Sequence, residues 1–173
     1  MSKAQLIEIA RENIEYAQAG TIRQAAEIGR VPVEHYYDAQ RWQYECERVF
    51  QRMPLVLATT CELHPPGDYK ALSVMGKPVL ICRTASGELK AFENSCAHRG
   101  AQVVAAGRGN AKRFVCPYHA WSYDNNGALK HVLTEDDFGA VDRSCNGLVQ
   151  LRCLERAGLI WVTLDSRSKL SIE

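Results

Sequence analysis

The feature that most constrains this chain is a set of four metal-binding side chains at fixed spacing. Cys96 and His98 form a C-x-H pair, seventeen residues intervene, and Cys116 and His119 form a C-x-x-H pair. Two thiolates and two imidazoles on two loops suit a two-iron, two-sulfide cluster, in which the cysteines bind one iron and the histidines bind the other. The pattern therefore predicts a [2Fe-2S] centre held by Cys96, His98, Cys116 and His119, and a chain that transfers electrons.

The two kinds of ligand predict an asymmetric cluster. Anionic thiolates favour the ferric state of their iron, whereas neutral imidazoles donate less charge, so we expect an incoming electron to settle on the iron held by the histidines. Residues i and i+2 of an extended loop point the same way. We therefore expect Cys96 and His98 to reach different irons from an extended loop, with Tyr118 and Trp121 excluding water on one side.

A zinc site is the main alternative for this ligand set, because structural zinc also uses two cysteines and two histidines. Structural zinc sites usually space their ligands as C-x-x-C and H-x(3-5)-H, and a C-x-H half is unusual. The spacing favours iron with sulfide. A zinc-stabilised binding module remains the alternative on ligand count alone.

Charge and hydropathy exclude several other classes of function. With 21 basic and 20 acidic residues the formal net charge is +1, so no net field attracts nucleic acid or an anionic membrane surface. The longest apolar runs, such as 159–162, are far too short to span a bilayer. Glu8, Arg11 and Glu12 interrupt the amino-terminal segment, which argues against a secretory signal. These features predict a cytoplasmic protein with no nucleic-acid or membrane partner.

The cysteine content also indicates a reducing compartment. Of the seven cysteines, five remain after Cys96 and Cys116 are assigned to the cluster, and they are scattered along the chain. An odd, scattered set does not suggest a disulfide framework, so we expect no structural disulfide. Three of the five lie in strand-like runs and are expected to be buried, unreactive thiols: Cys61, Cys82 and Cys153.

The amino-terminal part is helical in pattern. Residues 2–20 place apolar side chains on one face, with Ser2 and Gln5 spaced as a capping box and Gly20 as the end of the helix. A second helix is predicted over residues 38–51, where apolar side chains again recur at helical spacing. We expect this part to form an arm, residues 1–53, that packs on another surface.

From residue 55 the pattern changes to short β-type runs separated by turn residues. The fold class predicted is mainly β: a small antiparallel β-sandwich domain with metal-binding loops, over residues 54–165, preceded by the amino-terminal α-helices. Residues 166–173 are polar and are expected to be a linker or the start of a further domain. Seven strands are predicted, over 55–60, 69–75, 79–83, 89–93, 113–116, 148–153 and 159–164.

The ligand loops and their flanks resemble a known family. Over about residues 36–165 the chain is similar to the Rieske [2Fe-2S] domain, and more narrowly to the amino-terminal part of the large (α) subunit of bacterial aromatic ring-hydroxylating dioxygenases. The resemblance rests on the two ligand loops, which are highly specific, and on segments 64–69, 91–94 and 159–165.

This resemblance implies a role within an oxidoreductase. Such a domain takes electrons from a ferredoxin or reductase and passes them to a mononuclear non-haem iron in an oxygenase catalytic domain, which in the family lies in a neighbouring subunit of a trimer. The implied cofactor of this chain is a Rieske-type [2Fe-2S] cluster, and none of its residues is predicted to be catalytic. The mononuclear iron is expected only in a catalytic domain beyond Glu173, so this chain alone is not expected to act as an oxygenase.

Two further points follow from the resemblance. High-potential Rieske proteins carry an extra cysteine in each ligand loop, whereas this chain has Ala101 and Tyr118 there, which implies a potential at the low end of the range. A stand-alone Rieske ferredoxin is the second interpretation, but such carriers generally lack an extension like residues 2–53. The remaining histidines, His35, His64 and His131, are too widely separated to predict a second iron site.

Overall fold

The computed structural model describes residues 1–168 of the chain, and these form two compact units. The first unit is Met1–Asp38 and the second begins at Ala39. The boundary predicted at residue 53 is a different division, based on the change from helical to β-type periodicity, and stays a prediction. Among the described residues, no helix combines the length and the apolar character needed to cross a bilayer.

The first unit contains helix α1 (Lys3–Ala19) and a short 3-10 turn, η1 (Val33–Tyr36). The ends of α1 are those that the sequence predicts. Ser2 accepts a hydrogen bond from the Gln5 amide, the Gln5 side chain accepts one from the Ser2 amide, and Gly20 takes a left-handed conformation with φ of 64°. None of the residues of α1 is buried within this unit.

The helix predicted over residues 38–51 is two segments of different pitch. Helix α2 (Ala39–Glu45) is α-helical and is followed directly by a π-helical turn, η2 (Cys46–Phe50). The Gln51 amide donates to the carbonyl of Cys46, five residues back, at 3.0 Å. A wider turn of this kind cannot be predicted from the spacing of apolar residues, because a single turn of five residues is too short to show a different period.

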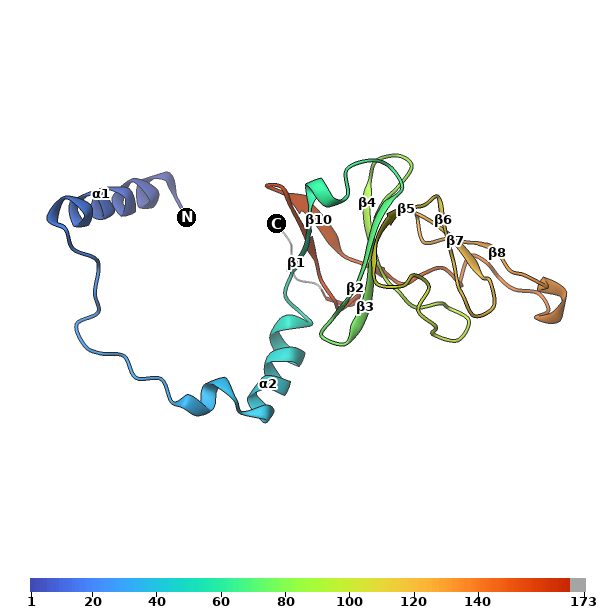
Figure 1. Ribbon diagram of the computed structural model, residues 1–173, viewed down its shortest axis with the longest axis horizontal. Helices are drawn as coiled ribbons and strands as arrows, with labels where there is room; N and C mark the ends of the chain where they lie inside the picture. Colours follow the sequence, from blue (N-terminus) through green and yellow to red (C-terminus); the bar gives the residue numbers. More distant parts are fainter. Residues whose placement is uncertain (169–173) are drawn as a thin grey trace. The chain divides into compact units, whose positions relative to one another are not determined.

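The second unit is mainly β, as predicted, and its strands form three antiparallel sheets. Figure 1 shows β2, β3 and β4 in the middle of the β domain and β6, β7 and β8 toward one end of it. The sheets have the orders β1-β11-β10, β5-β2-β3-β4-β9 and β6-β7-β8. The strands are β1 (Leu55–Thr59), β2 (Asp68–Val74), β3 (Lys77–Arg83), β4 (Leu89–Glu93), β5 (Gly107–Asn110), β6 (Arg113–Val115), β7 (Ser122–Asp124), β8 (Leu129–His131), β9 (Gln150–Leu151), β10 (Cys153–Arg156) and β11 (Leu159–Val162).

The central sheet is buried on both faces, because alternate residues of one strand enter two different cores. In β3, Val79 and Ile81 pack with the β1-β11-β10 sheet, whereas Leu80 and Cys82 pack with the β6-β7-β8 sheet and the ligand loops. These four side chains are fully buried. Burying each Val, Leu or Ile contributes about 1.5–3 kcal/mol to stability, so this strand stabilises both cores of the β domain.

Three strands were not predicted, and one predicted strand is two separate strands in the structure. Strands β5, β7 and β8 lack an alternating apolar pattern of useful length. The run predicted over 148–153 becomes β9 and β10, because Leu151 pairs with Ala91 of the central sheet while Cys153 pairs with Val162 of the outer one. The chain changes sheets at Arg152, a step that depends on partners far away in the sequence.

One cysteine prediction is also corrected by the structure. Cys82 is buried and Cys153 is partly buried, but Cys61 is exposed. Cys61 lies in the 3-10 turn η3 (Thr60–Glu62) that directly follows β1, where the alternation of the strand no longer turns its side chain inward.

Candidate metal centre

The two ligand loops have the same backbone turn although their ligand spacings differ. In the first loop, which follows β4, the Cys96 amide donates to Ala101 and the Gly100 amide donates to Cys96, both at 2.8 Å. In the second, between β6 and β7, the Cys116 amide donates to Trp121 at 2.8 Å and the Ala120 amide donates to Cys116 at 3.0 Å. Each loop therefore folds back on its own cysteine within six residues.

A left-handed residue makes each turn possible. It is the fourth residue after the cysteine in both loops: Gly100 with φ of 71° and Ala120 with φ of 55°. The prediction that Cys96 and His98 lie on an extended loop is wrong, because residues 97–99 form a tight turn closed by these hydrogen bonds. The chain reversal also brings the His98 amide to the Cys96 sulfur.

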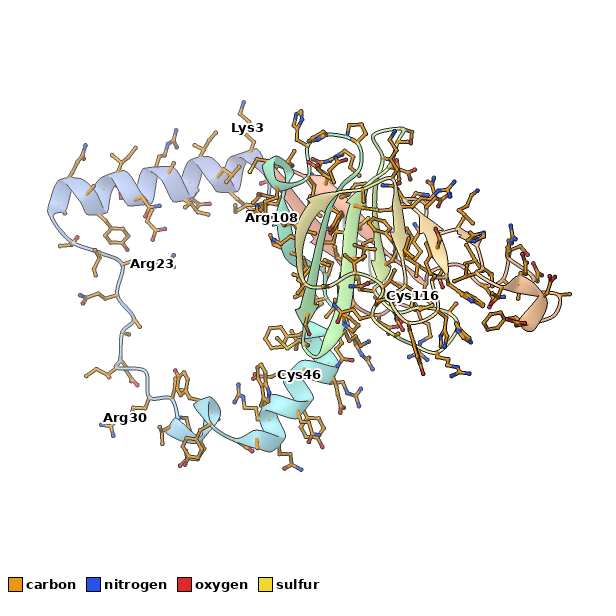
Figure 2. The ribbon with its side chains drawn as sticks, turned by 45° about the vertical axis from the view of Figure 1, so that its right-hand side comes forward. Lys3, Arg23, Arg30, Cys46, Arg108 and Cys116 are labelled. Carbon is orange, nitrogen blue, oxygen red and sulfur yellow. The ribbon has the colours of Figure 1, made fainter. Side chains whose placement is uncertain are left out.

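The two cysteine side chains form the buried side of the site. Cys96 is 3% exposed and Cys116 is 2% exposed, and both belong to the core between the central sheet and β6-β7-β8. Burial raises the pKa of the Cys96 thiol, while hydrogen bonds from the Tyr123 hydroxyl and the His98 amide oppose that increase. A buried thiolate needs a compensating positive charge, which a metal ion would supply. Figure 2 labels Cys116 within the β domain, apart from Cys46 on the helical segment.

The Tyr123 hydroxyl lies 3.1 Å from the sulfur of Cys96, and the Ala97 amide donates to the same hydroxyl oxygen at 3.1 Å. If Cys96 binds iron as a thiolate, its sulfur has no proton to donate, so the Tyr123 hydroxyl is the donor in that contact. Tyr123 is fully buried. Burial raises the pKa of its phenol, with a further contribution from Cys96, so the hydroxyl stays protonated at neutral pH and remains a donor.

The two histidine rings form the outer side of the site. Their centroids lie 4.6 Å apart, and both residues are partly exposed. Trp121 stacks on His98 at 5.0 Å with an interplanar angle of 10°, and Tyr118 lies over His119 at 3.8 Å. The pKa of His98 is lowered, first by its removal from water and then by the charges of His119 and Arg99. The neutral imidazole, which is the metal-binding form, is thereby favoured.

The residues present fit a cluster with two irons. The Nδ1 atom of His119 is buried and has no hydrogen-bond partner among the described residues, as expected for a nitrogen that binds metal. Over residues 1–168, no three His, Cys, Asp or Glu side chains converge as the ligands of a single ion. A structural zinc ion needs four such ligands, whereas each iron of a [2Fe-2S] cluster needs only two from the protein.

Two residues that support the site, Tyr123 and Asn94, were not predicted from the sequence. The buried side chain of Asn94 donates to the Val104 carbonyl at 2.7 Å and accepts from the Val104 amide at 3.0 Å, which closes the loop that carries Cys96 and His98. Their nearness to the ligands in the sequence is a weak signal, because it does not show where a side chain points.

The four predicted ligands are thus brought together, and the other three histidines are not. His35, His64 and His131 are exposed and lie on different segments. The acidic group near His131 is partly used by Arg143, whose guanidinium forms an ion pair with Glu135. The structure therefore concentrates the metal-binding groups at one end of the β domain.

Comparisons with known proteins agree with this geometry. Residues 53–146 match the family described as the Rieske [2Fe-2S] domain. The chain is 36% identical over 138 residues to the chlorobenzene dioxygenase subunit alpha of Cupriavidus sp. (strain PS12), covering 79% of this chain and 31% of that subunit. It is 31% identical over 149 residues to the glycine betaine monooxygenase oxygenase subunit of Pseudomonas aeruginosa, covering 86% of this chain and 34% of the relative.

Solved structures show the same similarity. Naphthalene 1,2-dioxygenase from Rhodococcus sp. bound to indole superposes with a TM-score of 0.74 at 33% identity, over 80% of this chain and 32% of that one. A quaternary ammonium Rieske monooxygenase gives a TM-score of 0.74 at 30% identity, over 82% of this chain and 41% of that one. The chain spans about a third of the length of the curated relatives that it matches.

The matched family is defined by a [2Fe-2S] cluster, which is the cofactor that the buried thiols and the paired imidazoles fit. The match includes both ligand loops and more than half of the 173 residues. The chain therefore belongs to the Rieske [2Fe-2S] domain family.

Proposed function

We propose that this chain is the electron-transfer domain of a Rieske oxygenase large subunit, of the aromatic ring-hydroxylating dioxygenase type. It accepts one electron at a time from a ferredoxin or reductase and delivers it to a mononuclear non-haem iron in an oxygenase catalytic domain of a neighbouring subunit. The observation that carries this proposal is the asymmetry of the site: the cysteines are buried, whereas the histidines are partly exposed.

Each ligand has a defined role in this proposal. Cys96 and Cys116 would hold one iron from the core, and His98 and His119 would hold the other at the surface. When bound, the cluster supplies one-electron redox chemistry, with potentials known for the Rieske class of about −150 to +300 mV. Ala101 and Tyr118 cannot form a disulfide between the loops, which supports a potential at the low end of that range.

The extent of similarity supports an oxygenase subunit over a stand-alone ferredoxin. The 138 residues aligned with the chlorobenzene dioxygenase subunit extend beyond residues 53–146, so the similarity is not confined to the Rieske domain itself. Dioxygenase alpha subunits named for benzene and biphenyl are also among the relatives. We propose aromatic hydrocarbon catabolism as the process, a homotrimer as the assembly of the full-length protein and the cytoplasm as its location.

The test of this function uses the 173-residue protein prepared without oxygen. We expect two irons and two acid-labile sulfides per chain, and a Rieske-type paramagnetic resonance signal after reduction. Reduced ferredoxin, regenerated by its reductase, is expected to produce the same signal. A colourless protein that binds zinc and contains no sulfide would contradict the proposal.

Tyr123→Phe is expected to lower the reduction potential while the cluster stays bound. The hydroxyl donates to the Cys96 sulfur, and that donation stabilises the reduced cluster more because reduction adds a negative charge. We expect a decrease of about 60 mV, which corresponds to a tenfold change in a one-electron equilibrium. Potentiometric titration measures it, with Tyr69→Phe as the matched control, because Tyr69 packs against the same core from β2.

A further inference from the structure

Phe138 reaches the metal centre from a segment outside both ligand loops. It follows the short 3-10 turn η4 (Glu135–Asp137), in the connection between β8 and β9. Its ring lies edge-on to His98, with centroids 5.1 Å apart and an interplanar angle of 89°. The same ring lies edge-on to Trp121 at 6.1 Å. Phe138 and Trp121 therefore cover two sides of the His98 ring.

The segment that carries Phe138 is anchored at both ends. Val132 is 2% exposed, and Val141 packs against the core that contains Cys96 and Cys116. The residues between them are largely exposed. In Figure 1 this segment projects beyond β8 at one end of the β domain. The contact of Phe138 with His98 thus belongs to an excursion, residues 133–140, whose two ends are fixed in the core.

The excursion is also strained and braced. Thr134 has φ of 50°, a left-handed conformation that is strained for a β-branched residue. Arg143 spans the segment, because its guanidinium pairs with the Glu135 carboxylate and donates to the Lys130 carbonyl at 3.2 Å. A strained turn that is held in place by a cross-brace directs Phe138 toward His98.

We infer that Phe138 is a positioning residue that shields the His98-bound iron from water and thereby keeps the reduction potential of the cluster low. This inference rests on the proposed function, in which His98 is a ligand. Reduction adds one negative charge to the cluster, and water stabilises that charge better than an aromatic ring does. Phe138 contacts the His98 ring and is itself 37% exposed to solvent, so its ring covers part of the His98 surface.

The test compares variants of the cluster-loaded 173-residue protein. Phe138→Ala is expected to shift the midpoint potential in the positive direction. It is also expected to increase the deuterium coupling seen by pulsed paramagnetic resonance in D2O, because water reaches the cluster. Oxidation of the reduced protein by ferricyanide, which accepts one electron, is expected to become several-fold faster.

Matched variants separate shielding from general disturbance of the segment. Phe138→Tyr keeps the ring and is expected to behave as the unmodified protein. Arg143→Met removes the brace and is expected to increase the deuterium coupling by a smaller amount. Its lost positive charge lowers the potential by itself, so deuterium coupling is the readout for this variant. Leu133→Ala removes another exposed apolar side chain from the excursion and is expected to leave the potential unchanged.

The outcomes are distinguishable from failure of the proposed function. If the unmodified protein shows the Rieske signal and Phe138→Ala changes neither potential nor deuterium coupling, the shielding role is overturned and the function stands. If the unmodified protein lacks the signal, both fail together. If Phe138→Ala loses its cluster, Arg143→Met decides, because an unchanged deuterium coupling in that variant also overturns the inference.

Discussion

Replacing Cys116 by alanine is expected to abolish cluster assembly. The thiolate is the ligand, and a [2Fe-2S] cluster that loses one of its two cysteines cannot hold the iron on the buried side. Cys116 is 2% exposed and its backbone closes the second ligand loop, so neither water nor a neighbouring side chain can replace it. Iron and sulfide content are expected to fall close to zero, and the visible absorption and paramagnetic resonance signal should disappear.

Cys82→Ala is the matched control for this substitution. Cys82 is an equally buried thiol in the same core, but it lies on β3 and donates to the Asn125 carbonyl at 3.3 Å. Its loss is expected to cost some stability and to leave the cluster in place. His119→Ala is expected to remove the two-iron spectrum as Cys116→Ala does, whereas His131→Ala should keep it. A variant of Cys116 or His119 that retains the full Rieske spectrum would show that the ligand assignment is wrong.

Among the substitutions proposed for this protein, Gly127→Ala is expected to cause the largest decrease in the free energy of unfolding. Gly127 ends the turn between β7 and β8 with φ of +79°, and an added Cβ would lie 2.4 Å from a ring carbon of Phe92. Phe92 is fully buried in the core beside the ligand loops, so its ring cannot move aside. Backbone strain costs about 1–3 kcal/mol and overpacking a further 1–3 kcal/mol or so. The sum is a large share of the roughly 5–15 kcal/mol that stabilises an ordinary domain.

A second glycine provides the control for backbone strain alone. Gly87 has φ of +84°, and no atom lies within 4 Å of where its Cβ would be. Chemical denaturation of both alanine variants gives two free energies of unfolding, and their difference measures the clash with Phe92. Equal losses in the two variants would mean that the close approach of Gly127 to Phe92 has no energetic effect.

The candidate metal-binding residues and most of the framework could be predicted from the sequence. The spacing of Cys96, His98, Cys116 and His119 is a local signal, since each pair sits within four residues. Three other predicted features are local in the same sense: the cap at Ser2, the helix end at Gly20 and strand β4. These features depend on the chemistry of a few adjacent side chains, and no distant partner is needed to fix them.

Strand β5, which is rich in glycine, could not be predicted from adjacent residues alone. It forms because β2 offers an edge to pair with, and Gly109 lies where a Cβ would be 2.8 Å from the Tyr69 hydroxyl. No alternating pattern marks Gly107–Asn110 as a strand, since its residues contribute backbone hydrogen bonds and space rather than apolar side chains.

The sequence by itself predicted four candidate ligands, which the structure brings together on two loops, and determined the mainly β framework that carries them. Only the tertiary structure decided how those ligands are surrounded: the Tyr123 hydroxyl on the Cys96 sulfur, and Phe138 edge-on to His98. The physical reason is that the ligand prediction rests on short-range spacing, whereas these two contacts join residues 27 and 40 positions apart along the chain. Such contacts exist only after the sheets have packed.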